Sequence, residues 1–123
     1  MARILVLDDV PEIVRSLHRI LEPAGYEVVG ATTARDALQA LNKRPADLVI
    51  TDIFMPDRDG LEFIQDLRAR YPDIKILAMS GGTDNFPADS FLTVARHFGS
   101  QRSIMKPFEP AALLQAVSEL LSS

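Results

Sequence analysis

Five polar residues each stand at the end of a short apolar run: Asp8, Asp9, Asp52, Ser80 and Lys106. Three carboxylates gathered within a few ångströms repel one another, and a hard divalent cation with oxygen ligands relieves that repulsion. A site with few protein ligands and several bound waters favours Mg²⁺. A lysine opposite the acids pairs with one of them or binds an anion. Together with a hydroxyl donor, these groups form a site for a phosphoryl group, which a central aspartate can accept as an acyl phosphate.

The elements that must position these residues are visible in the hydrophobic pattern. Short apolar runs alternate with helical patterns, and strands are expected at 4–7, 26–31, 48–52, 74–80 and 102–105. Helices are expected between and after these runs. Thr33 predicts the N-cap of the second helix, with Asp36 three residues later, and Pro45 predicts its end.

This alternation predicts an α/β fold with a doubly wound parallel sheet, because strand–helix crossovers of this length join parallel strands and cover both faces. The first, third and fourth runs are the most apolar and are expected at the centre. Glu27, Arg102 and Ser103 place the other two strands at the edges. The strand order 2-1-3-4-5 satisfies both conditions. In such sheets the ligand binds outside the carboxyl ends of the strands, where the five polar residues would meet.

Each of these residues also has an ordinary structural explanation when taken singly. An aspartate at a strand end commonly caps the following helix, and Asp8 or Asp9 could cap the helix that begins near Pro11. Polar residues at four strand ends of one sheet are much harder to explain in this way. The methionines in or beside the strands are expected in the core: Met55, Met79 and Met105.

Length and composition limit the classes of protein to which the chain can belong. The chain has 123 residues, of which 47% are hydrophobic and 24% charged, so one globular domain spanning residues 1–123 is expected. The absence of cysteine excludes disulfides, iron–sulfur clusters and thiol nucleophiles. A net charge of −4 argues against binding to nucleic acid or to an anionic membrane. We expect a cytoplasmic protein, because the sequence contains neither a signal peptide nor a membrane span.

Four motifs, taken together, resemble those of a known family. They read LVLDD at 5–9, ITDIFMPDRDG at 50–60, MSG at 79–81 and MKPF at 105–108. In combination, and over essentially the whole chain, they resemble the receiver domain of two-component response regulators. The resemblance implies a flavodoxin-like (βα)5 fold, in agreement with the strand order reached from the hydrophobic pattern.

The resemblance also implies a role for each site residue. Asp52 would be the phospho-acceptor. Asp9 would bind Mg²⁺ directly, Asp8 mostly through water, and Phe54 through its backbone carbonyl. Asp52 would also belong to the metal site. Ser80 and Lys106 would act on the phosphoryl group itself.

In this resemblance Ser80 contacts a phosphoryl oxygen, and Lys106 pairs first with the acids and then with the phosphate. The phosphoryl group would come from a sensor histidine kinase or a histidine phosphotransfer protein. The domain would catalyse its own phosphorylation and dephosphorylation rather than act as an enzyme on other molecules. Because the chain ends after the last expected helix, it resembles a stand-alone chemotaxis or phosphorelay regulator whose output is binding to another, unidentified protein. A fragment of a larger regulator is the alternative.

Two alternatives compete with this interpretation. One is a phosphatase or phosphotransferase that acts on a small molecule through an aspartyl phosphate. It is disfavoured because Asp8 and Asp9 are adjacent rather than spaced, and because no cap segment is present. The other is an interaction module of the same fold that is never phosphorylated, which fits poorly with the joint presence of Asp52, Ser80 and Lys106.

One departure from the family pattern concerns signal transmission. Ser103 stands three residues before the lysine, where the family usually carries Tyr or Phe. The segment 80–99 is also longer than is usual. We therefore expect the segment 81–87, with its two glycines and Phe86, to carry the conformational signal in place of a strand aromatic.

Overall fold

A five-stranded parallel sheet with the order β2-β1-β3-β4-β5 forms the centre of the molecule. The computed structural model describes residues 2–53, 60–80, 102–106 and 108–122. The strands are β1 (Arg3–Leu7), β2 (Glu27–Ala31), β3 (Leu48–Asp52), β4 (Lys75–Ser80) and β5 (Arg102–Met105). The helices are α1 (Pro11–Leu21), the 3-10 turn η1 (Glu22–Ala24), α2 (Ala34–Lys43), α3 (Gly60–Arg70) and α5 (Pro110–Ser122). The predicted doubly wound α/β fold and its strand order are thus confirmed.

Some of the sequence-based expectations fall outside the described residues. They concern the backbone carbonyl of Phe54, the core position of Met55, and the helix and conformational signal expected within 81–99. These expectations remain predictions.

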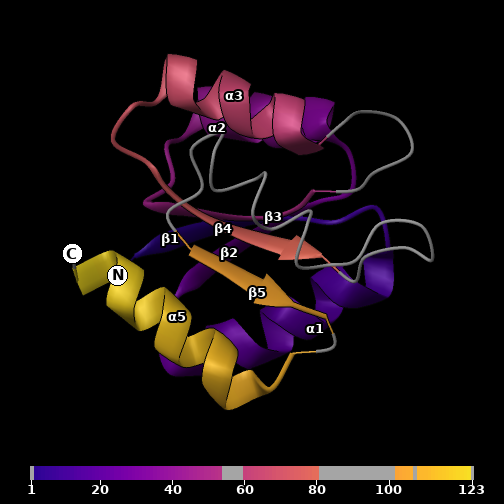
Figure 1. Ribbon diagram of the computed structural model, residues 1–123, viewed down its shortest axis with the longest axis vertical. Coiled ribbons are helices and arrows are strands. Elements are labelled where there is room, and N and C mark those ends of the chain that lie inside the picture. The colour runs from indigo at the N-terminus through magenta and orange to yellow at the C-terminus, as the bar shows by residue number, and fades with distance from the viewer. Residues whose placement is uncertain (1, 54–59, 81–101, 107, 123) are drawn as a thin grey trace.

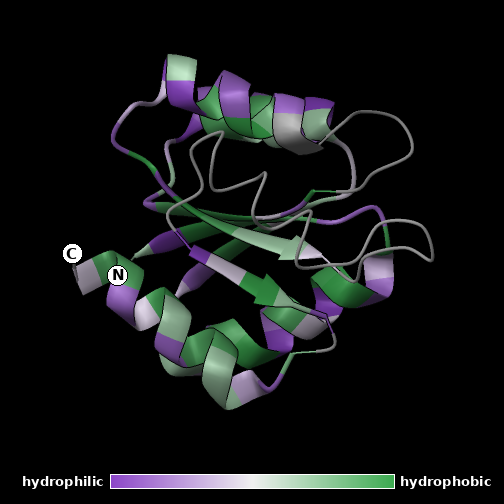
Figure 2. Ribbon diagram, in the orientation of Figure 1, coloured by the Kyte–Doolittle hydropathy of each residue, from purple (hydrophilic) through white to green (hydrophobic). Residues whose placement is uncertain are grey.

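The helices form two layers that enclose the sheet (Figure 1). Helices α2 and α3 lie over one face and helices α1 and α5 over the other. Each face has its own hydrophobic core, and the strand residues alternate between the two. Leu5 and Val49, for example, belong to the core beneath α2 and α3, whereas Ile4 and Ile50 belong to the core beneath α1 and α5. The helices accordingly turn apolar residues to the sheet and polar residues outward (Figure 2).

Burial follows the predicted positions of the strands. Every residue of β3 is buried, whereas β2 and β5 are mostly half-buried, as expected for edge strands. Met79 lies in the core, as predicted. The prediction for Met105 is wrong, because its side chain is 50% exposed. Met105 ends an edge strand, where alternation turns Ile104 toward the core beneath α1 and α5 and Met105 toward the opposite face.

Local signals fix the ends of α2 and the close packing of α1. The Thr33 hydroxyl accepts a hydrogen bond from the Asp36 backbone amide at 3.1 Å, which confirms the predicted N-cap. The helix ends where Arg44 becomes extended before Pro45. Helix α1 packs so closely on β2 that a Cβ on Gly30 would lie 2.5 Å from Val14 Cγ1.

Among the described residues, no helix combines the length and the apolar character needed to cross a membrane.

Candidate functional site

Three aspartates meet at the carboxyl ends of neighbouring strands. Asp8 and Asp9 directly follow β1, and Asp52 is the last residue of β3, which pairs with β1 in parallel. One carboxylate oxygen from each of the three lies within 4.8 Å of the others. Asp8 is completely buried and Asp52 is 5% exposed. The sheet therefore brings together the three acids that the sequence predicted would converge.

Asp8 is held from both sides of its carboxylate. Its Oδ1 accepts a hydrogen bond from the Val10 backbone amide at 2.9 Å, and its Oδ2 lies 2.6 Å from Lys106 Nζ. Val10 is the N-cap residue of α1, and no side chain caps this helix. Asp8 thus fixes the turn that leads into α1. The N-cap of this helix is Val10, so the capping role considered from sequence for Asp8 or Asp9 is wrong. Its second oxygen is committed to the lysine.

Lys106 joins the end of β5 to the acids on β1 and β3. Its ammonium lies 2.6 Å from Asp8 Oδ2 and 3.3 Å from Asp52 Oδ2. Burial by itself would lower the pKa of Lys106, but the hydrogen bond to Asp8 and the charges of Asp52 and Asp8 together raise that pKa above its usual value. The lysine is therefore a fixed positive charge in this site at neutral pH.

Ser80 and Lys106 are tied together through the backbone. Ser80 is the last residue of β4 and is completely buried. Its carbonyl accepts a hydrogen bond from the Lys106 backbone amide at 3.0 Å. This bond continues the pairing of β4 with β5 past Met105, the partner of Ser80 in the strand register. All five polar residues singled out from sequence therefore stand at one edge of the sheet.

Asp9 differs from the other two acids because it is partly accessible to solvent. Partial burial and the neighbouring charge of Asp8 raise the pKa of Asp9 above its usual value, against smaller opposing effects from its own backbone amide and from Lys106. An ionised Asp9 is therefore poorly compensated by the protein itself, and it is an acid that a bound cation would stabilise.

The donor set fits a hard divalent cation. Three carboxylates and one ammonium leave a formal charge of −2 when all four groups are ionised. The candidate ligands are all carboxylate oxygens, and histidine and cysteine contribute none within the described part of the chain. Oxygen ligands of this kind, few in number and open to water on the Asp9 side, suit Mg²⁺ better than zinc or copper.

The structure adds one polar group that the sequence analysis did not single out. Thr51, one residue before Asp52, is completely buried, and its hydroxyl donates a hydrogen bond to the Asp52 backbone carbonyl at 2.9 Å. A signal for it was present in the sequence, because Thr51 is the one hydroxyl residue in the otherwise apolar run 48–51.

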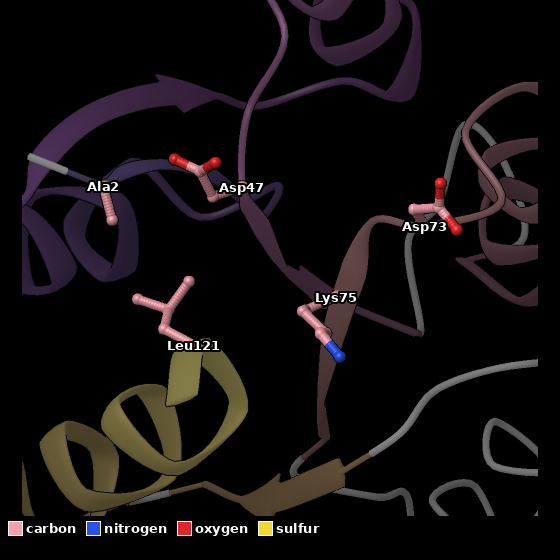
Figure 3. A pocket seen from close by; sticks show the side chains of 5 residues that line it. All are labelled: Ala2, Asp47, Asp73, Lys75 and Leu121. Carbon is pink, nitrogen blue, oxygen red and sulfur yellow. The ribbon is translucent and has the colours of Figure 1, made fainter. Parts of the chain in front are cut away.

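A second concentration of charged residues lies at the amino edge of the sheet, where the strands begin. A cavity of about 490 Å³ there is lined by Ala2, Asp47, Asp73, Lys75 and Leu121 (Figure 3). Asp47 precedes β3 and Lys75 begins β4, so this cavity lies at the amino ends of strands whose carboxyl ends carry the three-aspartate site. The side chain of Lys75 extends away from Asp47 in Figure 3. Acids and a lysine are present here without converging on one point.

The fold and the site define a class of protein: a flavodoxin-like α/β domain with an acidic, lysine-containing site at the carboxyl edge of its sheet. A family model of the response regulator receiver domain matches residues 4–118. The chain therefore belongs to the response regulator receiver domain family. Receiver domains are phospho-accepting signalling modules of two-component systems, and this membership does not favour the phosphatase and non-phosphorylated alternatives.

Individual relatives agree with this membership. The chain is 30% identical to the chemotaxis protein CheY of Thermotoga maritima over 119 residues, which is 96% of each protein. It is 31% identical to the alkaline phosphatase synthesis transcriptional regulatory protein PhoP of Bacillus subtilis, but the match covers 97% of this chain and 48% of PhoP. The chain thus spans about half the length of PhoP, and likewise 46% of the KdpE regulator of Mycobacterium tuberculosis.

Solved structures show the same arrangement. The chemotaxis protein CheY4 of Vibrio cholerae superposes with a TM-score of 0.86 at 31% identity, and the match covers 98% of both chains. The receiver domain of NtrX from Brucella abortus gives a TM-score of 0.89 at 30% identity, with the same coverage. The similarity therefore extends over the whole α/β architecture and is not limited to the motifs.

Proposed function

We propose that residues 1–123 form one receiver domain in which Asp52 is the residue that accepts the phosphoryl group. The observation that carries this assignment is the position of Lys106 Nζ, 2.6 Å from Asp8 and 3.3 Å from Asp52, beside three carboxylates within 4.8 Å of one another. Asp8 is completely buried and bound on both oxygens, so Asp52 is better suited to react. An ionised carboxylate at this point is a competent nucleophile toward phosphorus.

The phosphoryl donor in this proposal is a phosphohistidine of a sensor kinase or phosphotransfer protein, or a small acyl phosphate. An Asp52 carboxylate oxygen forms a bond to phosphorus as the bond from phosphorus to the donor breaks, and the donor leaves with that electron pair. Lys106 stabilises the charge on the transferred group, as a fixed cation does in other phosphoryl-transfer sites. Ser80, at the end of β4, is the candidate hydroxyl donor to a phosphoryl oxygen.

Asp8, Asp9 and Asp52 are the described residues that would hold Mg²⁺, together with the backbone carbonyl of Phe54 that the family resemblance implies. A bound Mg²⁺ would neutralise charge on the phosphoryl oxygens and so lower the barrier to transfer. Asp9 and Asp52 are proposed as direct ligands. Asp8 is proposed to act mostly through water, because its Oδ2 is already bound to Lys106.

The proposed domain catalyses its own phosphorylation and the slow hydrolysis of its aspartyl phosphate. Its phosphorylated form would change its binding to an output protein. This agrees with the membership of a chemotaxis protein and a transcriptional regulatory protein in the same family. The charge and the acidic site give no support to direct binding of nucleic acid.

The decisive experiment measures the intact mass of the protein after incubation with Mg²⁺ and acetyl phosphate. The wild type should gain one phosphoryl group that hydroxylamine removes, because acyl phosphates react with this nucleophile. Asp52→Asn should gain none, and removal of Mg²⁺ with a chelator should prevent labelling of the wild type.

Asp47→Asn is the matched control, because Asp47 is an aspartate next to the same strand but at its other end. This variant should be labelled like the wild type. Equal labelling of wild type and Asp52→Asn would refute the assignment of Asp52 as acceptor.

A further inference from the structure

Thr51 places a hydroxyl inside an apolar layer, where packing alone does not call for one. Its side chain is completely buried and its partners in the strand register are Leu7 of β1 and Ala78 of β4, both core residues. Val49, two residues before Thr51 in β3, and Ile53, two residues after Thr51, belong to the same hydrophobic core. A buried hydroxyl is unfavourable unless it is hydrogen-bonded, and valine has nearly the same shape without this requirement.

The hydrogen bond of Thr51 acts at the point where strand pairing changes. Pairing of β1 with β3 ends at Leu7 and Thr51, whereas pairing of β3 with β4 continues to Asp52 and Met79. The Ile53 backbone amide still donates to the Met79 carbonyl at 3.1 Å. Asp52 is therefore the first residue of β3 that is not paired with β1. The Thr51 hydroxyl binds the Asp52 carbonyl at this position, at 2.9 Å.

We propose that Thr51 is a positioning residue for Asp52. Its hydroxyl fixes the orientation of the peptide group between Asp52 and Ile53, and with it the direction in which the Asp52 side chain leaves the backbone. That direction sets the contact of Asp52 Oδ2 with Lys106 Nζ, which lie 3.3 Å apart. The inference rests on the proposed function in one respect, namely that Asp52 is the phospho-acceptor.

The test compares wild type, Thr51→Val and Thr51→Ser. Val removes the hydroxyl and keeps the shape, whereas Ser keeps the hydroxyl and removes a methyl group. The initial rate of phosphoryl incorporation is measured by intact mass at saturating Mg²⁺ and several concentrations of acetyl phosphate. Thr51→Val should lower the rate about tenfold, because a small displacement of a reacting group is costly. Thr51→Ser should stay within about twofold of the wild type, since its hydroxyl can reach the same carbonyl.

Val49→Ala controls for loss of packing. Val49 is buried on the same face of the same strand, and its partners in the strand register are Leu5 and Ile76, two core residues. This variant should lower the midpoint of thermal unfolding more than Thr51→Val does, yet leave the phosphorylation rate of the folded protein unchanged. If Thr51 had a merely structural role, the phosphorylation rates of the variants would follow their thermal stabilities. Thr51→Ser would then be phosphorylated no faster than Thr51→Val.

A second readout does not depend on phosphorylation. In crystal structures of the metal-free variants, the contact between Asp52 and Lys106 should be lost in Thr51→Val and kept in Thr51→Ser. A Thr51→Val protein that keeps this contact, or that is phosphorylated at the wild-type rate, overturns the positioning role. A wild type that takes no phosphoryl group contradicts the proposed function instead, and the crystal structures still decide whether Thr51 positions Asp52.

Discussion

The carboxyl edge of the sheet, where the strands end, and the amino edge, where they begin, carry the same types of charged group and arrange them differently. At the carboxyl edge, Asp8 and Asp52 are buried and Lys106 reaches both of them. At the amino edge, Asp47 and Lys75 line one cavity, but no ion pair joins Lys75 to an acid among the described residues. Asp47 instead accepts a hydrogen bond from the Arg3 backbone amide at 2.8 Å, and so fixes the start of β1.

This difference shows that convergence and burial, not composition, distinguish a reactive site from an ordinary charged surface. Water screens exposed charges and lets each side chain move independently. Burial removes that screening, so the energy of each charge at the carboxyl edge depends on the neighbouring charges. A substitution at the carboxyl edge should therefore have a larger effect than its counterpart at the amino edge.

The largest effect is expected from Lys106→Met compared with Lys75→Met. Loss of the Lys106 ammonium removes the cation that faces Asp8 and Asp52, so the phosphorylation rate should fall roughly 100-fold. It also leaves the buried Asp8 without its charged partner, which should lower the free energy of unfolding by about 2–4 kcal/mol at pH 7. Lys75→Met should change neither quantity measurably. The two measurements are intact mass after treatment with acetyl phosphate and urea denaturation.

The pH dependence of the Lys106 contribution follows from the direction of its pKa shift. Folding raises the pKa of this lysine above 10.5, so its contribution to stability is fully present below pH 10.5. That contribution is lost as the pH rises through the folded-state pKa. The stability difference between wild type and Lys106→Met should therefore shrink above pH 10.5. A difference that grows in this range would mean that Lys106 is not held as a cation by the acids.

An intermediate effect is expected on metal binding. Asp9→Ala should weaken the affinity for Mg²⁺ about tenfold, because one of the proposed carboxylate ligands is removed. Asp73→Ala, at the amino edge, should leave the affinity unchanged. Isothermal titration calorimetry with MgCl₂ measures both. Equal affinities for the two variants would exclude Asp9 from the ligand set.

The smallest effect concerns the stability of the metal-free protein. Folding raises the pKa of Asp9 above 3.8, so the folded state holds this proton more tightly than the unfolded state. The associated stability is present below pH 3.8 and is lost as the pH rises through the folded-state pKa. Asp9→Asn should therefore raise the melting temperature modestly at pH 7, and this gain should disappear toward pH 3. Asp47→Asn should show no such gain, and a matching gain there would remove the distinction between the two edges.

Much of the fold could be predicted from local pattern. The position of β3 was predicted to the residue, and the N-cap of α2 at Thr33 was recognised from one hydroxyl and its spacing to Asp36. These features are local, since they depend on alternation and on backbone amides a few residues away. Met105 was misplaced because its exposure depends on which side of an edge strand it faces, and hydrophobicity alone does not give that.

The sequence by itself determined the strand order and the identity of the residues at the carboxyl edge. Parallel strands must end at the same edge of their sheet, so Asp8, Asp52 and Lys106 are brought to one place by the order of the elements. Only the tertiary structure decided which acid the lysine binds at 2.6 Å and which at 3.3 Å, and that the Thr51 hydroxyl holds the Asp52 carbonyl. These contacts depend on ångström-scale separations between side chains up to 98 residues apart in the chain, and such separations are set by how the helices and strands pack, not by local sequence.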